Sequence, residues 1–373
     1  MQPPLHLLIK PASGNCNLRC TYCFYADITE KRSIPSFGMM TGETLELVVR
    51  KALSSGAPEV TFAFQGGEPT LSGLPFFRRL MALEAQYNTH HATLHNVIQT
   101  NGMLLNDEWA SFFAENHFLV GLSVDGTESV HDLHRVDASG QGTHHRLMQA
   151  VRLLKKHNVD FNILTVVTAK VAKEIKSIYA FYRRQNLPYQ QYIPCLDPLG
   201  EPRGGRPYSL TPPLYERFLK DLFDLWFDDV THGRFIYIRY FENLVGMLLG
   251  HPPEACGMMG FCSRQNVVEA DGSVYPCDFY VLDDYRLGSL VTDTFTDIDR
   301  AREALGFIEQ SRPLASECAS CQWRPLCRGG CRRDREPMID GQLSLNYFCP
   351  AYKGFFAYAY PRLAHIARAV APR

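Results

Sequence analysis

The chain has 373 residues, a length that suits roughly two domains. Its 38 basic and 39 acidic residues leave a formal net charge of −1, so neither nucleic acid nor an anionic membrane surface is indicated as a partner. No secretory leader is evident, and no run approaches the ~18 apolar residues of a membrane helix. We therefore expect a cytoplasmic protein that contacts no membrane, and we expect the basic run Arg332, Arg333 and Arg335 to be solvated or to face a partner.

Segments typical of strands and of helices alternate through the first 200 residues. Apolar and β-branched runs predict six strands, at residues 5–10, 60–64, 94–100, 118–124, 161–168 and 190–194. Helical spacing predicts helices between them, over residues 42–52 after a Thr41 cap, 76–85, 107–115, 147–154 and 172–184. Such alternation is typical of βαβ units with parallel strands. The α/β class therefore follows, as a partial (β/α)6 barrel similar to a TIM barrel, with a doubly wound open sheet as the alternative.

The pattern changes after about residue 200. A segment rich in glycine and proline leads to a predicted helix over residues 214–229, and the stretch 256–349 is dense in cysteines and turns. A last helix is predicted over residues 352–369. We expect two domains, with the partial barrel in residues 1–235 and a cysteine-rich domain with a C-terminal helix in residues 236–373.

Three cysteines follow the first predicted strand, with the spacing Cys16-x3-Cys20-x2-Cys23. Three thiolates on a short loop can hold three irons of a [4Fe–4S] cluster and leave the fourth iron open to a substrate or cofactor. Gly67 and Glu68 follow the second strand, and Ser123 ends the fourth. Parallel barrels build their sites at this edge, where the strands end.

Eight further cysteines lie near the C-terminus, which is enough for two sites with four thiolates each. A cytoplasmic chain uses cysteines for metals or chemistry more often than for disulfides. Four thiolates suit Zn²⁺ as well as iron, so the spacing alone leaves both metals open, and the N-terminal triad favours iron. The cysteines are Cys256, Cys262, Cys277, Cys318, Cys321, Cys327, Cys331 and Cys349. Residues 270–273 predict a hairpin turn ahead of Cys277, and Cys195 is left over as a packed thiol.

These motifs resemble a known family. The N-terminal triad with Tyr22 is similar to the radical SAM signature, and the C-terminal spacing resembles the SPASM extension. The segments 8–13, 62–70 and 275–280 resemble anaerobic sulfatase-maturating enzymes, and the motifs run in order from residue 5 to about 363. That family oxidises a cysteine or serine of a sulfatase, in a Cys/Ser-x-Pro-x-Arg segment, to Cα-formylglycine. The resemblance implies S-adenosylmethionine, three [4Fe–4S] clusters and an external electron donor such as flavodoxin or ferredoxin.

The resemblance also implies residue roles. Cys16, Cys20 and Cys23 hold the cluster that binds S-adenosylmethionine. Auxiliary cluster I is held by Cys256, Cys262, Cys277 and Cys331, and auxiliary cluster II by Cys318, Cys321, Cys327 and Cys349. The expected contacts of S-adenosylmethionine are Tyr22, Gly67, Glu68, Ser123, Arg135 and Leu196.

Asp278 is the expected catalytic residue, because it follows Cys277 and a carboxylate there can accept the proton that the target thiol or hydroxyl loses. Without the resemblance, an aspartate that caps a turn would be the simpler interpretation. Tyr25 and Gln65 lie close to the two N-terminal motifs and are expected to line the peptide channel.

Two other functions stay open at this point. One is a different SPASM enzyme that forms thioether or carbon–carbon cross-links in a peptide. The other is an iron–sulfur electron carrier or a zinc scaffold without enzymatic activity. The sequence does not distinguish a cysteine target from a serine target.

Overall fold

The computed structural model describes residues 3–339 and 341–371 of the chain. These divide into two compact units. The first unit comprises residues 1–124, 131–162 and 264–305, and the second comprises residues 125–130, 163–263 and 306–373. The predicted boundary between residues 235 and 236 stays a prediction.

The first unit is built on strands that pair in chain order. Each of β1 to β4 is parallel to the next, so that Ile9 lies opposite Phe64 and Phe64 opposite Ile98. A later hairpin extends this sheet, since β8 is parallel to β1, β9 is antiparallel to β8, and β10 is antiparallel to β9. The strands are β1 (Leu5–Ile9), β2 (Glu59–Phe64), β3 (Thr93–Thr100), β4 (Leu119–Ser123), β8 (Asn266–Val268), β9 (Ser273–Tyr275) and β10 (Gly288–Ser289).

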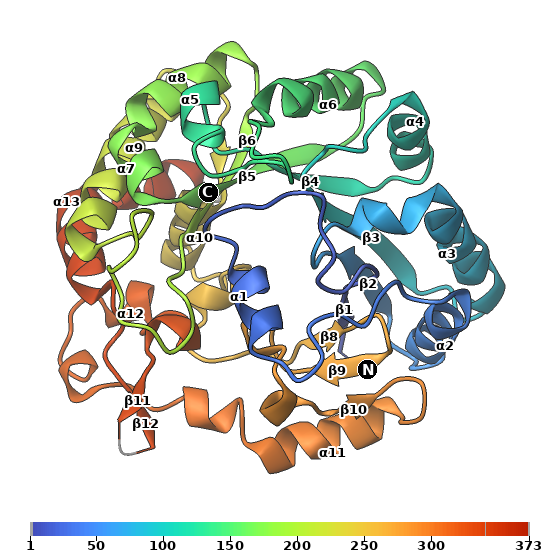
Figure 1. Ribbon diagram of the computed structural model, residues 1–373. Coiled ribbons are helices and arrows are strands. Elements are labelled where there is room, and N and C mark those ends of the chain that lie inside the picture. The colour runs from blue at the N-terminus through green and yellow to red at the C-terminus, as the bar shows by residue number, and fades with distance from the viewer. Residues whose placement is uncertain (1–2, 340, 372–373) are drawn as a thin grey trace. The chain divides into compact units, whose positions relative to one another are not determined.

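Helices cover the outer face of these strands, and α1 lies on the opposite side of them (Figure 1). The helices are α1 (Phe24–Glu30), α2 (Gly42–Leu53), α3 (Gly73–Tyr87), α4 (Asp107–Glu115), α6 (His144–Lys156) and α11 (Phe295–Leu305). Strands in sequential order with the connecting helices α2, α3 and α4 on one face are typical of a barrel and not of a doubly wound sheet, whose strand order reverses. Buried rings of Phe64, Phe77, Trp109 and Phe118 fill the space between strands and helices.

The second unit holds three further parallel strands and most of the C-terminal region. Strand β6 pairs with β5 on one side and β7 on the other, and β11 pairs with β12 in a separate hairpin. The long helices α9 and α13 pack against each other. The strands are β5 (Phe161–Val167), β6 (Tyr189–Pro194), β7 (Tyr237–Ile238), β11 (Met338–Ile339) and β12 (Gln342–Leu343). The helices are α5 (Glu128–His131), α7 (Ala169–Lys173), α8 (Ile175–Arg184), α9 (Pro212–Thr231), α10 (Arg239–Leu248), α12 (Arg324–Cys327) and α13 (Cys349–Val370).

Most predicted elements are confirmed within one to three residues. The hydroxyl of Thr41 caps α2 as expected, since it accepts the backbone N–H of Thr44. The hairpin turn before Cys277 is also present, with Gly272 at a φ of +86°. The helix predicted over residues 172–184 is confirmed as α8, and a break at Glu174 separates it from the short helix α7, which was not predicted. Several elements were not predicted, among them α1, α10, α11 and β7.

The expectation for Arg332, Arg333 and Arg335 is also wrong. Their exposed fractions are only 3%, 5% and 1%, and their guanidinium groups donate to buried carbonyl oxygens. Sequence periodicity gave no sign of this, because a short 3₁₀ turn and not a helix or strand carries them. Across the described part of the chain, we find no helix of the length and apolarity needed to cross a membrane.

One buried carboxyl group in the first unit gives a test of the packing between α3 and β3. Glu84 is 7% exposed, and its Oε2 accepts the side-chain N–H of Asn96 at 3.1 Å. Its Oε1 is buried with no hydrogen-bond partner among the described residues. Burial raises the pKa of Glu84 from 4.5 to about 7, although the Asn96 hydrogen bond opposes this.

We predict that Glu84→Gln stabilises the protein at alkaline pH. A carboxyl group with a raised pKa in the folded state binds its proton more tightly than in the unfolded chain, so its contribution to stability is lost as pH rises from 4.5 through about 7. The glutamine variant should therefore gain about 2 kcal/mol in the free energy of unfolding at pH 8.5 and much less at pH 5.5. Melting temperatures at the two pH values measure this, with the exposed Glu43→Gln as control. An equal loss of stability at both pH values would contradict it.

Candidate active site and metal centres

The three N-terminal cysteines lie on the loop between β1 and α1. Cys23 is the N-cap residue of α1, and all three side chains are partly exposed. The sulfur of Cys16 accepts the backbone N–H of Leu18 at 3.4 Å and the side-chain N–H of Asn101 at 3.8 Å. Burial raises the pKa of the Cys16 thiol to about 11. Iron binding would therefore displace a proton there, and the two N–H donors would then stabilise the thiolate.

Gly66 and Gly67 pack directly on this loop. The backbone N–H of Gly67 donates to Ser13 O at 2.8 Å, and that of Glu68 donates to Asn15 O at the same distance. A Cβ atom on Gly67 would lie 1.9 Å from Asn15 O, and Gly66 has a φ of +125°. The two glycines are therefore required by the close approach of two backbones, whatever else binds beside them.

The Glu68 carboxylate is almost fully buried and already has four donors. Oε1 accepts the backbone N–H and hydroxyl of Thr70 and the hydroxyl of Thr100, and Oε2 accepts the backbone N–H of Asn101. These hydrogen bonds connect the end of β2 with the end of β3. Burial nonetheless raises the pKa of Glu68.

The other residues expected to contact S-adenosylmethionine fall in different places. Tyr22 is buried with its ring against His134, and the guanidinium carbon of Arg135 lies 5.5 Å from the Tyr22 ring centre. Ser123 is buried at the end of β4. Leu196 belongs to the second unit, where it follows β6 and is partly exposed.

Asp278 is held by two side chains from the ends of β1 and β2. Its Oδ1 lies 2.5 Å from the ammonium of Lys10, and its Oδ2 accepts the side-chain N–H of Gln65 at 3.2 Å. The side chain of Lys10 is fully buried, whereas that of Asp278 is 15% exposed. The Lys10 contact is an ion pair. A buried ammonium requires such a counter-charge, so the position of Asp278 is constrained.

A second buried network lies beside this pair. The Lys10 ammonium is 3.8 Å from the centre of the Tyr25 ring, and the Tyr25 hydroxyl donates to Glu269. Glu269 also forms a 2.6 Å ion pair with Arg32, and both side chains are fully buried. These contacts join α1, which follows the cysteine loop, to the hairpin that precedes Cys277. Lys10, Arg32 and Glu269 were not predicted as site residues. The one available signal was a lysine at the end of an otherwise apolar strand.

Four of the C-terminal cysteines line one cavity in the second unit. They are Cys318, Cys321, Cys327 and Cys349. Burial raises the pKa of Cys327 to about 11, and it also raises the pKa values of Cys318 and Cys349. A cavity walled by four thiols fits a cluster with a protein ligand on every iron.

Cys331 lies apart from that cavity. Burial is the main cause of its raised pKa, and Cys256 and Cys262 contribute as neighbouring thiols. Arg335 lies close to Cys262 and Cys331, and its buried Nε has no hydrogen-bond partner among the described residues. A buried cation with an unused donor fits thiolates or an anionic cluster at this position. Cys277 belongs to the first unit, where it follows β9.

A site for a single metal ion differs in geometry from a site for a four-iron cluster. Within residues 3–339 and 341–371, no three cysteine, histidine, aspartate or glutamate side chains are arranged to hold one metal ion. A cluster of four irons takes one thiolate on each iron and so spaces its thiolates more widely than one ion does. Cys195, expected as a packed thiol, is 3% exposed.

Comparisons with known proteins agree with this arrangement. Residues 11–181 match the radical SAM superfamily, and residues 256–322 match an iron–sulfur cluster-binding domain, SPASM. The two domains indicate iron–sulfur clusters and S-adenosylmethionine as cofactors.

Similar proteins cover the whole chain. A cysteine-type anaerobic sulfatase-maturating enzyme of Clostridium novyi is 48% identical over 99% of both chains. A serine-type enzyme of Bacteroides thetaiotaomicron is 32% identical over 96% of this chain and 90% of its own. The solved structure of native anSMEcpe with bound AdoMet and a Cp18Cys peptide superposes with a TM-score of 0.95 at 46% identity, over 99% of this chain and 100% of that one. The predicted α/β class, with a radical SAM domain and a SPASM domain, is confirmed. The chain belongs to the anaerobic sulfatase-maturating enzymes of the radical SAM superfamily.

Proposed function

We propose that this enzyme converts a cysteine of a sulfatase polypeptide, within a Cys-x-Pro-x-Arg segment, to Cα-formylglycine. This chain is 47–48% identical in sequence to cysteine-type enzymes and 32% identical to serine-type enzymes, each over nearly the whole chain, and this difference favours a cysteine target. The peptide named with the matching solved structure supports a polypeptide substrate. We further propose an external one-electron donor, such as flavodoxin or ferredoxin, and a cytoplasmic location.

We propose three [4Fe–4S] clusters. One is held by Cys16, Cys20 and Cys23 with an open iron for S-adenosylmethionine. The hydrogen bonds to the Cys16 sulfur support this assignment. Auxiliary cluster I is assigned to Cys256, Cys262, Cys277 and Cys331, and auxiliary cluster II to Cys318, Cys321, Cys327 and Cys349. The buried Arg335 near Cys331 supports the first set, and the shared cavity supports the second.

For S-adenosylmethionine we propose contacts with Tyr22, Gly67, Glu68, Ser123, Arg135 and Leu196. The position of Ser123 at the end of β4, the edge at which parallel barrels build their sites, supports a hydrogen bond to the ribose. The Glu68 carboxylate already accepts four hydrogen bonds. The ammonium group of S-adenosylmethionine can therefore contact only the lone pairs that these hydrogen bonds leave free. When bound, S-adenosylmethionine and the cluster held by Cys16, Cys20 and Cys23 would supply the radical chemistry that takes one hydrogen atom from Cβ of the target side chain.

Asp278 is the proposed general base. Oxidation of the target cysteine to a thioaldehyde removes one hydrogen atom from Cβ, one proton from sulfur and one electron, after which water replaces sulfur as hydrogen sulfide. The proton needs an acceptor at the site, and the Asp278 carboxylate, held between Lys10 and Gln65 and 15% exposed, can be that acceptor.

Paired peptides test the substrate proposal. We expect anaerobic, reconstituted enzyme with dithionite and S-adenosylmethionine to turn a Cys-x-Pro-x-Arg peptide into an aldehyde about 18 Da lighter. The matched serine peptide should react at least about 10-fold more slowly, because a preference between such similar groups is worth about 1–2 kcal/mol. Mass spectrometry with hydrazide trapping measures both products. Faster serine oxidation would contradict the cysteine preference, and a carbonyl-free product about 2 Da lighter would instead support a cross-linking enzyme.

Replacement of the proposed base tests the role of Asp278. Asp278→Asn keeps a side chain of the same shape beside Lys10 but removes the proton acceptor, so we expect cleavage of S-adenosylmethionine to continue while aldehyde formation falls by about 10²-fold or more. The ratio of 5′-deoxyadenosine to aldehyde, measured on protein with wild-type iron content, reports this uncoupling.

The asparagine variant also removes the counter-charge of the fully buried Lys10, which can destabilise the fold. The double variant Lys10→Met/Asp278→Asn removes both charges and serves as the control. Aldehyde formation at the wild-type rate in either variant would rule out Asp278 as the base.

A further inference from the structure

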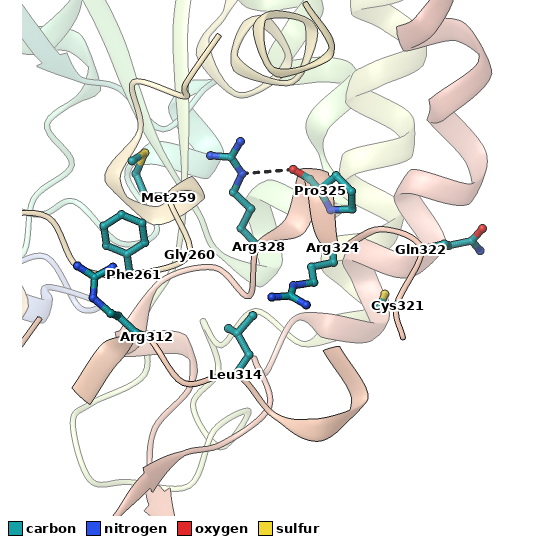
Figure 2. A pocket seen from close by; sticks show the side chains of 10 residues that line it. All are labelled: Met259, Gly260, Phe261, Arg312, Leu314, Cys321, Gln322, Arg324, Pro325 and Arg328. Carbon is teal, nitrogen blue, oxygen red and sulfur yellow. Dashed lines mark hydrogen bonds between the residues drawn. The ribbon is translucent and has the colours of Figure 1, made fainter. Parts of the chain in front are cut away.

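A hollow in the surface of the second unit lies on the outer side of one predicted cluster ligand. It measures about 640 Å³ and is lined by two stretches, residues 259–261 and residues 312–328 (Figure 2). Cys321 forms part of its wall. Cys321 and Arg324 also line the cavity that the four thiols share. The hollow therefore backs directly onto the place proposed for auxiliary cluster II.

The rim of the hollow is basic. Figure 2 shows the guanidinium groups of Arg312, Arg324 and Arg328 spaced around it. Arg312 forms an ion pair with Glu309 at 2.9 Å. In the described part of the chain, Arg324 and Arg328 have no carboxylate partner within 4 Å, and the only side-chain hydrogen bond of Arg328 is to Pro325 O at 3.3 Å. Two positive charges are thus left without neutralisation beside Cys321.

Apolar side chains lie between these cations. Phe261 packs under Arg312, with 4.6 Å from the guanidinium carbon to the ring centre, and Met259 and Leu314 line the same hollow. An apolar centre with arginine, methionine and aromatic residues is the composition of protein–protein contact faces. Small faces of this kind with complementary charges are typical of transient electron-transfer complexes.

The backbone holds this surface in shape. Arg328 adopts a left-handed conformation at a φ of +52°, which is uncommon for a residue other than glycine. Gly260 packs against it, and a Cβ atom there would lie 2.3 Å from Arg328 O. The backbone N–H of Arg328 donates to Arg324 O at 2.9 Å, which ends α12. Arg328 lies in the sequence between Cys327 and Cys331, two proposed cluster ligands. Because close packing keeps its uncommon backbone conformation, a functional role for this position is supported.

We infer that this hollow is the docking site of an acidic one-electron carrier protein, of the flavin or iron–sulfur class. The inference rests on the proposed assignment of Cys321 as a ligand of auxiliary cluster II. The carrier would place its carboxylates on Arg324 and Arg328 and bring its redox centre towards Cys321. One electron passes between the carrier and the cluster, so that one is oxidised as the other is reduced, and no atom or proton moves.

Charge reversal tests the inference with a binding measurement. A bacterial flavodoxin is the probe, titrated into anaerobic holoenzyme at low ionic strength by calorimetry. We expect the double variant Arg324→Glu/Arg328→Glu to raise its Kd by about 10-fold or more, and salt to weaken wild-type binding in the same way. The matched control Arg217→Glu/Arg300→Glu makes the same change in net charge at side chains that are 67% and 75% exposed and lie outside the hollow. Its Kd should stay within about 2-fold of wild type.

A second readout separates docking from cluster assembly. Iron content and the visible absorbance of the two double variants should equal those of the wild type. Dithionite-reduced enzyme mixed with oxidised flavodoxin should give the semiquinone about 10-fold more slowly in Arg324→Glu/Arg328→Glu than in the control.

Three results would overturn the inference. The first is that both double variants bind flavodoxin with equal affinity, and the second is that the wild type does not bind flavodoxin. The third is that Arg324→Glu/Arg328→Glu still binds flavodoxin but no longer binds the sulfatase peptide. The last would assign the surface to the substrate polypeptide. In each case, dithionite-driven aldehyde formation by the wild type would still support the proposed function, so the two failures are distinguishable.

Discussion

The buried ion pair of Lys10 and Asp278 is the interaction on which the proposed active site depends. Lys10 directly follows β1 and lies six residues before Cys16. Its ammonium has no access to solvent, so an anion must lie against it. Asp278 supplies that anion from the segment after β9, next to Cys277. This one contact therefore fixes where Asp278, the proposed base, lies relative to the loop of Cys16, Cys20 and Cys23, which is proposed to hold the radical-generating cluster. Gly66 makes room for it, since a Cβ atom there would lie 3.1 Å from the Lys10 side chain.

Around the C-terminal cysteines, too, buried charge requires compensation by an opposite charge. Burial raises the pKa values of thiols in both groups, so the chain alone favours neutral sulfur there. Arg335 is buried among carbonyl oxygens near Cys262 and Cys331 and offers the positive charge that thiolates need. In contrast, Arg324 and Arg328 stand at the surface beside Cys321, where their charge is available to a partner. Arginines thus serve two different purposes within a dozen residues of chain.

Much of the fold follows from local patterns, and much of the site does not. Apolar and β-branched runs predicted β1 to β6, and the Thr41 cap marked the start of α2. The break at Glu174 and the burial of Arg332, Arg333 and Arg335 depend on tertiary contacts that no local pattern records. The cysteines could be found by spacing, yet Cys331 lies between members of the other set in sequence, and only the folded chain separates it from them. Lys10 and Glu269 were missed because a lone charge in an apolar strand carries no periodic signal.

We propose that this enzyme removes a hydrogen atom from Cβ of a cysteine held beside Asp278. The most direct measurement uses a substrate peptide whose target cysteine carries two deuterium atoms on Cβ. We expect mass spectrometry to find one deuterium in the 5′-deoxyadenosine and one in the aldehyde, in equal amounts. 5′-Deoxyadenosine that contains no deuterium while the aldehyde accumulates would contradict it.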